Sequence, residues 1–250
     1  MSRHLPLEML DLIIDQLHDE PTTLKSCCLV SKSWIPRTRR HLFASVAFDT
    51  VGHPFTSWLK MFPNPLNSPA RHIRSLSVHR LPAITTTDAG VASCIRTFHN
   101  VVRLRFTHLI PADYEALTLF NGFTHTVRSL CLASTFFEVF DLVCSFPLLE
   151  DLALVSLRSE GDTVRRIAPS TSPRLTGSLE LSTTSGIRSA VRRLLGLPGG
   201  IRFAKITVSC FESDFEPATD LVSRCSGTLE HLIIYSSTTG TLPSASLIGR

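Results

Sequence analysis

The chain has 250 residues, enough for one long domain or for a small module followed by a larger one. Hydrophobic residues make up 43% and charged residues 18%, and the mean hydropathy is +0.18, which excludes a disordered chain and predicts a sizeable apolar core. No apolar run approaches the ~18 residues of a membrane span, and acidic residues interrupt any secretory signal. We therefore expect a globular protein of the cytoplasm or nucleus that does not associate with membranes.

Charge and cysteine content exclude two further classes. The net charge is +4, but the basic residues of the C-terminal part form only short clusters, whereas nucleic-acid binding needs a continuous basic stripe. The 7 cysteines form an odd set without a C-x-x-C pair. This pattern indicates free thiols in a reducing compartment, without disulfides.

Residues 5–43 predict three short helices. In the first, four apolar residues fall at i, i+3, i+4 and i+7 and form one stripe: Leu10, Ile13, Ile14 and Leu17. The segment HDEPTT at 18–23 interrupts this pattern, which resumes at Leu24, and Ser31 can cap a third helix that carries Trp34. A unit of about 40 residues rarely buries enough apolar area to be stable alone, so a partner or the following domain should cover the stripe.

The residue order of this segment resembles the F-box, the helical module that docks on the Skp-family adaptor of cullin–RING ubiquitin ligases. The resemblance rests on the Leu-Pro opening at Leu5 and Pro6 and on the Leu-Val-Ser-x-x-Trp close that ends at Trp34. It implies an F-box over residues 1–43. The adaptor-facing and core contacts would then come from nine residues: Leu5, Pro6, Ile13, Ile14, Leu17, Leu24, Leu29, Val30 and Trp34. An ordinary amphipathic helical hairpin is the alternative.

From residue 43 onward, an apolar pattern φ-x-x-φ-x-φ recurs. Its central residues are 22 to 30 positions apart, with one residue inserted in the sixth unit: Val46, Leu76, Leu104, Leu130, Leu152, Leu179, Ile206 and Leu232. This near-constant period predicts eight strands of a repeat domain. Helices are predicted between the strands over 88–98, 111–120, 136–146, 186–195 and 215–225, and irregular loops over 63–69 and 158–173.

The repeat resembles the leucine-rich repeat family, which implies a β/α solenoid with a parallel sheet over residues 44–250. The family's Asn after each repeat is missing, and its positions hold Leu81, Leu109, Thr135, Leu157, Thr184, Phe211 and Ser237. We therefore expect an α/β fold whose solenoid is irregular and whose turns are satisfied in another way. Residues 236–250 show no evident cap, so either this tail covers the end irregularly or further repeats follow.

A doubly wound sheet of Rossmann type is the alternative architecture, because it also alternates strands and helices. Its G-x-G-x-x-G fingerprint is absent. Gly196, Gly199 and Gly200 have another spacing, and they precede a predicted strand where a dinucleotide loop would follow one. These observations favour the solenoid.

Alternation along the strands predicts the side chains that face outward from the sheet. They form a mostly polar row, with arginines near one end and carboxylates in the middle. A solvated face accounts for this row, and a protein-recognition surface is the sharper hypothesis. Its candidate target-binding residues are Arg103, Arg105, Asp151, Glu180, Lys205 and His231.

Catalytic and metal-binding patterns are not apparent in the sequence. His72 and His79 are an odd number of residues apart on a predicted strand, so they should point to opposite faces. Cys131 has only His125 close in sequence, without a third group to activate the thiol. We therefore expect no enzyme activity, no cofactor and no metal.

The expected function is that of a non-catalytic substrate receptor. The F-box would bind the Skp-family adaptor and, through it, a cullin, while the repeats would hold a target protein for ubiquitination. A scaffold that uses its F-box outside a ligase is the alternative. A hydrolase or redox enzyme would need a pocket that joins Cys131 to a histidine.

Overall fold

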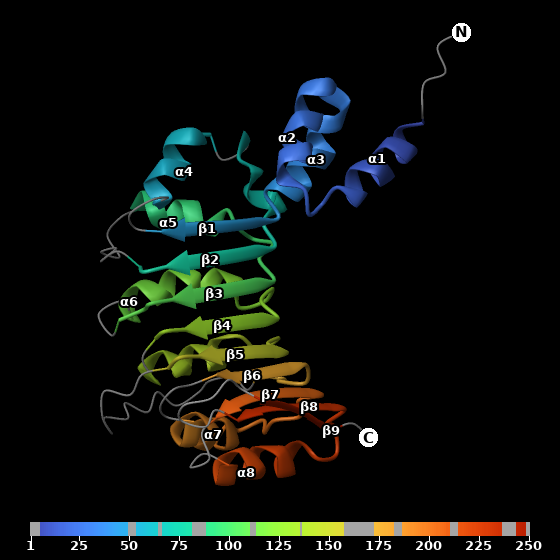
Figure 1. The fold of residues 1–250 in the computed structure, drawn as a ribbon. Coiled ribbons are helices and arrows are strands. Elements are labelled where there is room, and N and C mark those ends of the chain that lie inside the picture. Colours follow the sequence, from blue (N-terminus) through green and yellow to red (C-terminus); the bar gives the residue numbers. More distant parts are fainter. Residues whose placement is uncertain are drawn as a thin grey trace.

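The computed structural model describes residues 6–49, 54–64, 67–81, 89–110, 114–135, 137–157, 173–182, 187–210, 215–236 and 244–248. Leu5 and all but the last residue of the predicted 158–173 loop lie outside these ranges. The chain forms a small helical unit followed by one long stack of strands (Figure 1). Within the described residues, no helix is long and apolar enough to cross a membrane.

The helical unit contains the three helices that the sequence predicts and one short 3-10 helix: α1 (Leu7–Gln16), α2 (Pro21–Val30), η1 (Lys32–Trp34) and α3 (Ile35–Leu42). α2 begins at Pro21, inside the segment expected to break the helical pattern, because a proline at the first helical position loses no hydrogen bond. Ser31 is the predicted cap, and its Oγ accepts a hydrogen bond from the Ser33 backbone N–H at 3.3 Å. It caps η1, so Trp34 lies in that 3-10 turn and not in α3.

All eight predicted strands are present, and they form one parallel sheet in chain order: β1 (Ser45–Asp49), β2 (Ser75–His79), β3 (Arg103–Thr107), β4 (Ser129–Ala133), β5 (Asp151–Val155), β6 (Ser178–Ser182), β7 (Lys205–Cys210) and β8 (His231–Ser236). A doubly wound sheet reverses its strand order at a switch point. Each of these parallel strands instead pairs with its neighbour in the chain, so the Rossmann alternative is wrong and the fold is an α/β, solenoid-like one.

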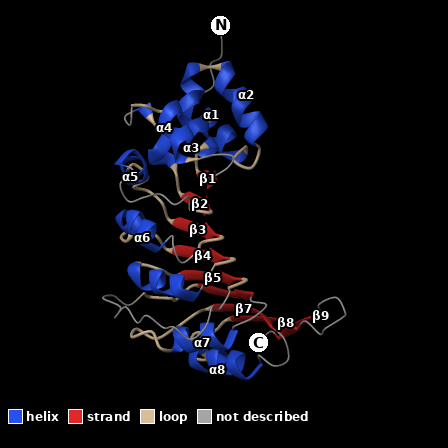
Figure 2. Ribbon diagram, turned by 90° about the vertical axis from the view of Figure 1, so that its left-hand side faces the viewer, coloured by secondary structure: helices blue, strands red, loops and turns tan. Residues whose placement is uncertain are grey.

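The helices of this part lie on one face of the sheet (Figure 2). They are α4 (Phe55–Met61), η3 (Pro69–His72), α5 (Ala89–Arg96), α6 (Tyr114–Leu117), η5 (Thr118–Phe123), η6 (Phe137–Ser145), α7 (Ile187–Leu195) and α8 (Phe215–Cys225). α4 and η3 were not predicted. The helix expected over 136–146 is present as a 3-10 helix, η6. A 3-10 helix rises more per residue than an α-helix, so it spans the shortest repeat with fewer residues.

The core lies between the sheet and the helices. Each of β2 to β7 places two buried apolar side chains on this side, and the register aligns them in two rows: Leu76, Leu104, Leu130, Leu152, Leu179 and Ile206, then Val78, Phe106, Leu132, Leu154, Leu181 and Val208. At the β1 end, Phe48 stacks on Phe55 with 4.1 Å between ring centroids. Phe43 follows α3 and packs edge-on against Trp58, so the helical unit shares packing with the sheet.

Backbone hydrogen bonds complete the turns in place of the missing asparagines. After each of β2 to β5, one residue adopts a positive φ: Arg80, His108, Ser134 and Ser156. Its N–H donates to the carbonyl of the last residue of the next strand, as from His108 to Ala133 at 3.0 Å. The next residue stands where a leucine-rich repeat would have its asparagine. It is buried in all four turns: Leu81, Leu109, Thr135 and Leu157. Thr184, Phe211 and Ser237 lie outside the described residues.

A ninth strand, β9 (Ser244–Ile248), pairs antiparallel with β8. The sequence of 236–250 gave no sign of β9, because the repeat pattern that identifies the other strands does not extend to this single short strand. Its backbone supplies hydrogen-bond partners to an edge of β8 that would otherwise offer unpaired N–H and C=O groups.

Candidate protein-docking surfaces

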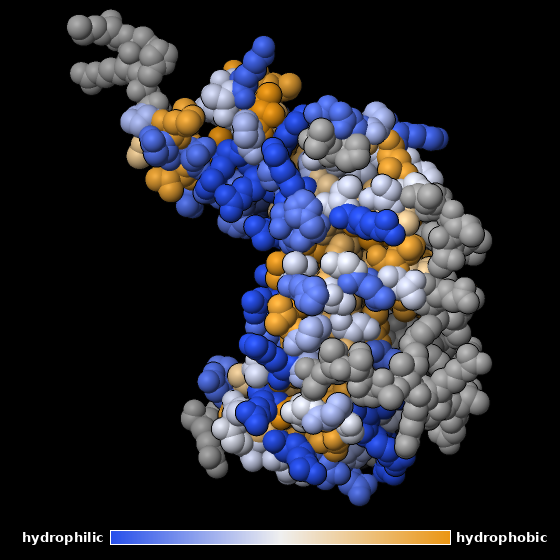
Figure 3. Space-filling view, turned by 180° about the vertical axis from the view of Figure 1, so that it is seen from behind, coloured by the Kyte–Doolittle hydropathy of each residue, from blue (hydrophilic) through white to orange (hydrophobic). Residues whose placement is uncertain are grey.

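The helical unit exposes large apolar side chains, visible in orange in Figure 3. They lie on α1 and at the end of α2, and we call them the helical apolar residues: Leu7, Met9, Leu12, Ile13, Leu29 and Val30. Leu29 is the most open, with 88% of its surface accessible. α1 also packs against η1, which follows α2 directly. Exposed apolar groups gathered on one small unit are typical of a protein-docking surface.

The core of the helical unit is small. Ile14, Leu24 and Cys27 are its buried apolar residues, together with the polar Thr38. The predicted stripe on α1 is therefore wrong in part, because Ile14 is 1% exposed while its neighbour Ile13 is 47% exposed. One face of α1 packs on the rest of the unit and another stays open.

The nine predicted adaptor-facing and core residues differ in exposure. Four are exposed, namely Pro6, Ile13, Leu29 and Val30, while Ile14 and Leu24 are buried and Leu17 and Trp34 are half-buried. Leu5 lies outside the described residues. Sequence reasoning missed Leu7, Met9 and Leu12. The signal was present, because Met9, Leu12 and Ile13 form a second i, i+3, i+4 series.

An ionic cluster holds α1 against α3. The Nε of Arg37 donates to Oδ1 of Asp15 at 2.6 Å, and its Nη2 donates to Oδ2. Nε2 of His41 lies 2.7 Å from Oδ1 of the same carboxylate. The hydrogen bonds from Arg37, and then that from His41, hold the pKa of Asp15 well below its usual range despite the opposing effect of burial. This cluster positions the exposed face of α1, and the sequence pattern gave no sign of it.

The outer face of the sheet carries the predicted target-binding residues. Arg103 and Arg105 are exposed and share β3, while Lys205 and His231 are exposed register partners on β7 and β8. Three strands separate the two pairs, which at the usual strand spacing is about 19 Å from β3 to β7. The six residues therefore do not converge on one site: the four basic ones form two patches, with Glu180 exposed on β6 between them.

Asp151 has a structural role. Its Oδ1 accepts hydrogen bonds from the backbone N–H and the Oγ of Ser178, at 2.7 and 2.8 Å. Gly177 lies directly beneath this carboxylate, and a Cβ at Gly177 would collide with Oδ1. The extra residue of the sixth repeat is accommodated here, because Asp151 takes the N–H of Ser178 while Gly177 bonds to the Glu150 carbonyl.

The thiol of Cys131 is half-buried on the same face, beside Arg105 in the register. Burial raises its pKa, Arg105 acts in the opposite sense, and Glu180 adds to the rise. A protonated thiol is a poor nucleophile at neutral pH. His79 packs edge-on against His108, whereas His72 belongs to η3, and no group of three potential ligands in the described ranges could hold a metal ion.

Comparisons of the chain with protein-family models, curated proteins and solved structures find no match. The chain's own residues therefore provide the basis for a functional assignment. They offer two candidate surfaces: the helical apolar residues and the polar outer face of the sheet.

Proposed function

We propose that this chain is the substrate-recognition subunit of an SCF-type cullin–RING ubiquitin ligase. Residues 1–43 would be an F-box that docks on a Skp-family adaptor, and residues 44–250 an irregular leucine-rich-repeat domain that binds a target protein. The observation that carries this proposal is the exposure of the helical apolar residues on a unit whose residue order resembles the F-box.

The energetics of the helical unit support docking. Its own core buries few side chains, whereas each exposed Leu or Ile would stabilise a complex by about 1.5–3 kcal/mol on full burial. An adaptor that buries Leu12 and Ile13 on α1 would gain free energy from both side chains.

The solenoid-like sheet supports the second half of the proposal. Stacked repeats create extended polar faces that suit protein recognition. The receptor would need no catalytic group of its own. It would hold a lysine-bearing target near a charged ubiquitin carrier and so raise the effective concentration of the reacting groups.

Co-purification with a recombinant Skp-family adaptor tests the proposal. The double substitution Leu12→Ser and Ile13→Ser should abolish detectable binding without unfolding the chain, because both side chains are exposed. The matched control is Met61→Ser with Ile110→Ser, two apolar residues outside the helical unit whose exposed fractions are somewhat larger than those of Leu12 and Ile13. Adaptor binding that survives in the first variant contradicts the proposal.

Testing the purified complex for a cullin distinguishes a ligase subunit from a scaffold that works outside a ligase. A ligase subunit brings a cullin into the purified complex together with the adaptor. Complexes that contain the adaptor and never a cullin would replace the ligase with a scaffold that uses its F-box elsewhere.

A further inference from the structure

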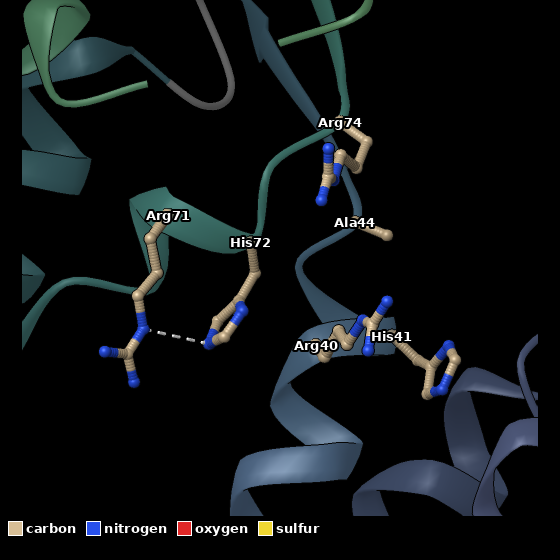
Figure 4. Close-up of a pocket in the computed structure, with 6 residues that line it drawn as sticks. All are labelled: Arg40, His41, Ala44, Arg71, His72 and Arg74. Atoms are coloured by element: carbon tan, nitrogen blue, oxygen red, sulfur yellow. Dashed lines mark hydrogen bonds between the residues drawn. The ribbon is translucent and has the colours of Figure 1, made fainter. Parts of the chain in front are cut away.

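A basic hollow lies where the helical unit meets the sheet (Figure 4). α3 packs against η3 there, and side chains from α3, from η3 and from the residues before β1 and β2 enclose an open cavity of about 130 Å³. We call it the junction hollow, and its lining residues are Arg40, His41, Ala44, Arg71, His72 and Arg74. Figure 4 shows Arg40 and His72 on opposite sides of the hollow, with Arg74 approaching from the start of β2.

The lining of the junction hollow is cationic. It includes three guanidinium groups and no carboxylate. The nearby carboxylate of Asp15 is already engaged by Arg37 and His41. Within the part of the chain that the structure describes, the guanidinium groups of Arg40 and Arg74 have no acidic partner. Arg40, Arg71 and Arg74 are exposed, so water and salt weaken the repulsion between them, and an anion bound among them would remove what remains.

His72 adds a hydrogen-bond donor to this lining. The Nε of Arg71 donates to Nε2 of His72 at 3.4 Å, so a neutral ring carries its proton on Nδ1. Burial lowers the pKa of His72, and the charges of Arg71, Arg40 and Arg39 lower it further. A bound anion would reverse this charge effect, which makes His72 a reporter of occupancy.

We propose that the junction hollow binds a small phosphorylated anion. Guanidinium groups match phosphate oxygens with paired hydrogen bonds. Figure 4 shows Arg40 and Arg74 coming from separate segments on one side of His72, whereas the guanidinium of Arg71 lies on the far side of that ring. A single water needs about 10–15 Å³ of such space, so the cavity has room for an oxyanion in place of several waters. Ala44 is its one apolar lining residue, so the hollow offers a flanking polypeptide little to pack against.

Such a ligand would connect the two parts of the chain. Arg40 belongs to α3, whereas Arg71 and Arg74 belong to η3 and to the segment before β2. A ligand that binds only the folded arrangement stabilises it by mass action, so the anion would fix the helical unit on the sheet. This inference does not depend on the proposed ligase function, because it concerns the chain alone.

Titration calorimetry with inorganic tripolyphosphate, at constant ionic strength, tests the proposal. Binding should weaken about tenfold for each arginine removed, since a hydrogen bond to a charged group is worth a factor of that order. The double variant Arg40→Gln with Arg74→Gln should therefore bind about 100-fold more weakly. Arg202→Gln with Arg224→Gln makes the same charge change at exposed positions outside the hollow and should bind as the natural chain does.

Proton NMR of His72 measures its pKa, which should not respond to tripolyphosphate that is attracted only by the overall positive charge of the chain. Tripolyphosphate should raise the pKa of His72 in the natural chain and in the Arg202/Arg224 control, and should not do so in the Arg40/Arg74 variant. Three results would overturn the proposal: no binding by the natural chain, an equal loss in both double variants, or binding that leaves His72 unchanged. A phosphoserine peptide that binds more tightly than tripolyphosphate would also overturn it, in favour of a protein ligand.

Discussion

The carboxylate of Asp15 accepts two hydrogen bonds from the guanidinium of Arg37, 22 residues further along the chain. The pair joins α1 to α3, and both side chains are more than two-thirds buried. α1 also buries Ile14 in the core of the helical unit, so this ion pair and the Ile14 side chain together fix how the exposed apolar face of α1 is presented.

Asp15→Asn should lower the free energy of unfolding by about 1 kcal/mol, the upper part of the range for partly exposed ion pairs, because the pair is bidentate. Urea unfolding measures the loss. The ionic contact that the described part of the chain gives the exposed Asp19 is with His18, so Asp19→Asn is the matched control and should change stability little. Equal stability of the two variants would show that the pair does not fix α1.

The Asp15 contribution should also depend on pH in a defined sense. The folded-state pKa of Asp15 lies below its unfolded value, so its contribution is complete above about pH 5 and is lost as the pH falls from about 4 toward the folded-state pKa. The difference in unfolding free energy between the natural chain and Asp15→Asn should therefore shrink at pH 3 relative to pH 7. A difference that grows on acidification would contradict this assignment.

Gly177→Ala should destabilise the sheet by about 1–3 kcal/mol, because the new Cβ would collide with the Asp151 carboxylate. Gly227→Ala is the control, since a Cβ there meets no atom within 4 Å. Thermal unfolding of Asp151→Ala and of the double variant completes a mutant cycle. The cost of Gly177→Ala should be smaller when Asp151 is already alanine, and strict additivity would argue against the collision.

Charge reversal at Arg103 and Arg105 should weaken capture of the target protein while adaptor binding stays unchanged. Both side chains are exposed on β3, outside the helical unit, so the substitutions to Glu should leave the fold intact. Quantitative affinity purification compares this variant with Arg202→Glu and Arg224→Glu. Identical sets of captured proteins would exclude the Arg103/Arg105 patch from target recognition.

The order of the sheet could be predicted from sequence because its signal is local and repeated. Each strand has apolar residues at alternate positions, and eight such strands at a near-constant spacing leave few topologies. The strands around Leu104 and Leu130 illustrate this, since both their faces and their register partners follow from the period.

The candidate sites were less predictable because they depend on contacts between distant residues. The junction hollow brings Arg40 together with Arg71 and Arg74, which no short motif connects. Asp151 resembled other outward-facing residues until its hydrogen bonds to Ser178 revealed a structural role. The exposed side of α1 was missed for a different reason: the helix is apolar on two faces, and the first stripe concealed the second.

The parallel strands pair only with their neighbours in the chain, and this has a kinetic consequence. Each strand pairing spans a single repeat, so folding can nucleate within any pair of repeats and propagate along the stack without waiting for more distant segments to meet. Opening should likewise begin at the ends and travel inward. The helical unit can therefore remain assembled on β1 and β2 while β7 and β8 exchange their amide protons, and a partner held at one end need not sense unfolding at the other.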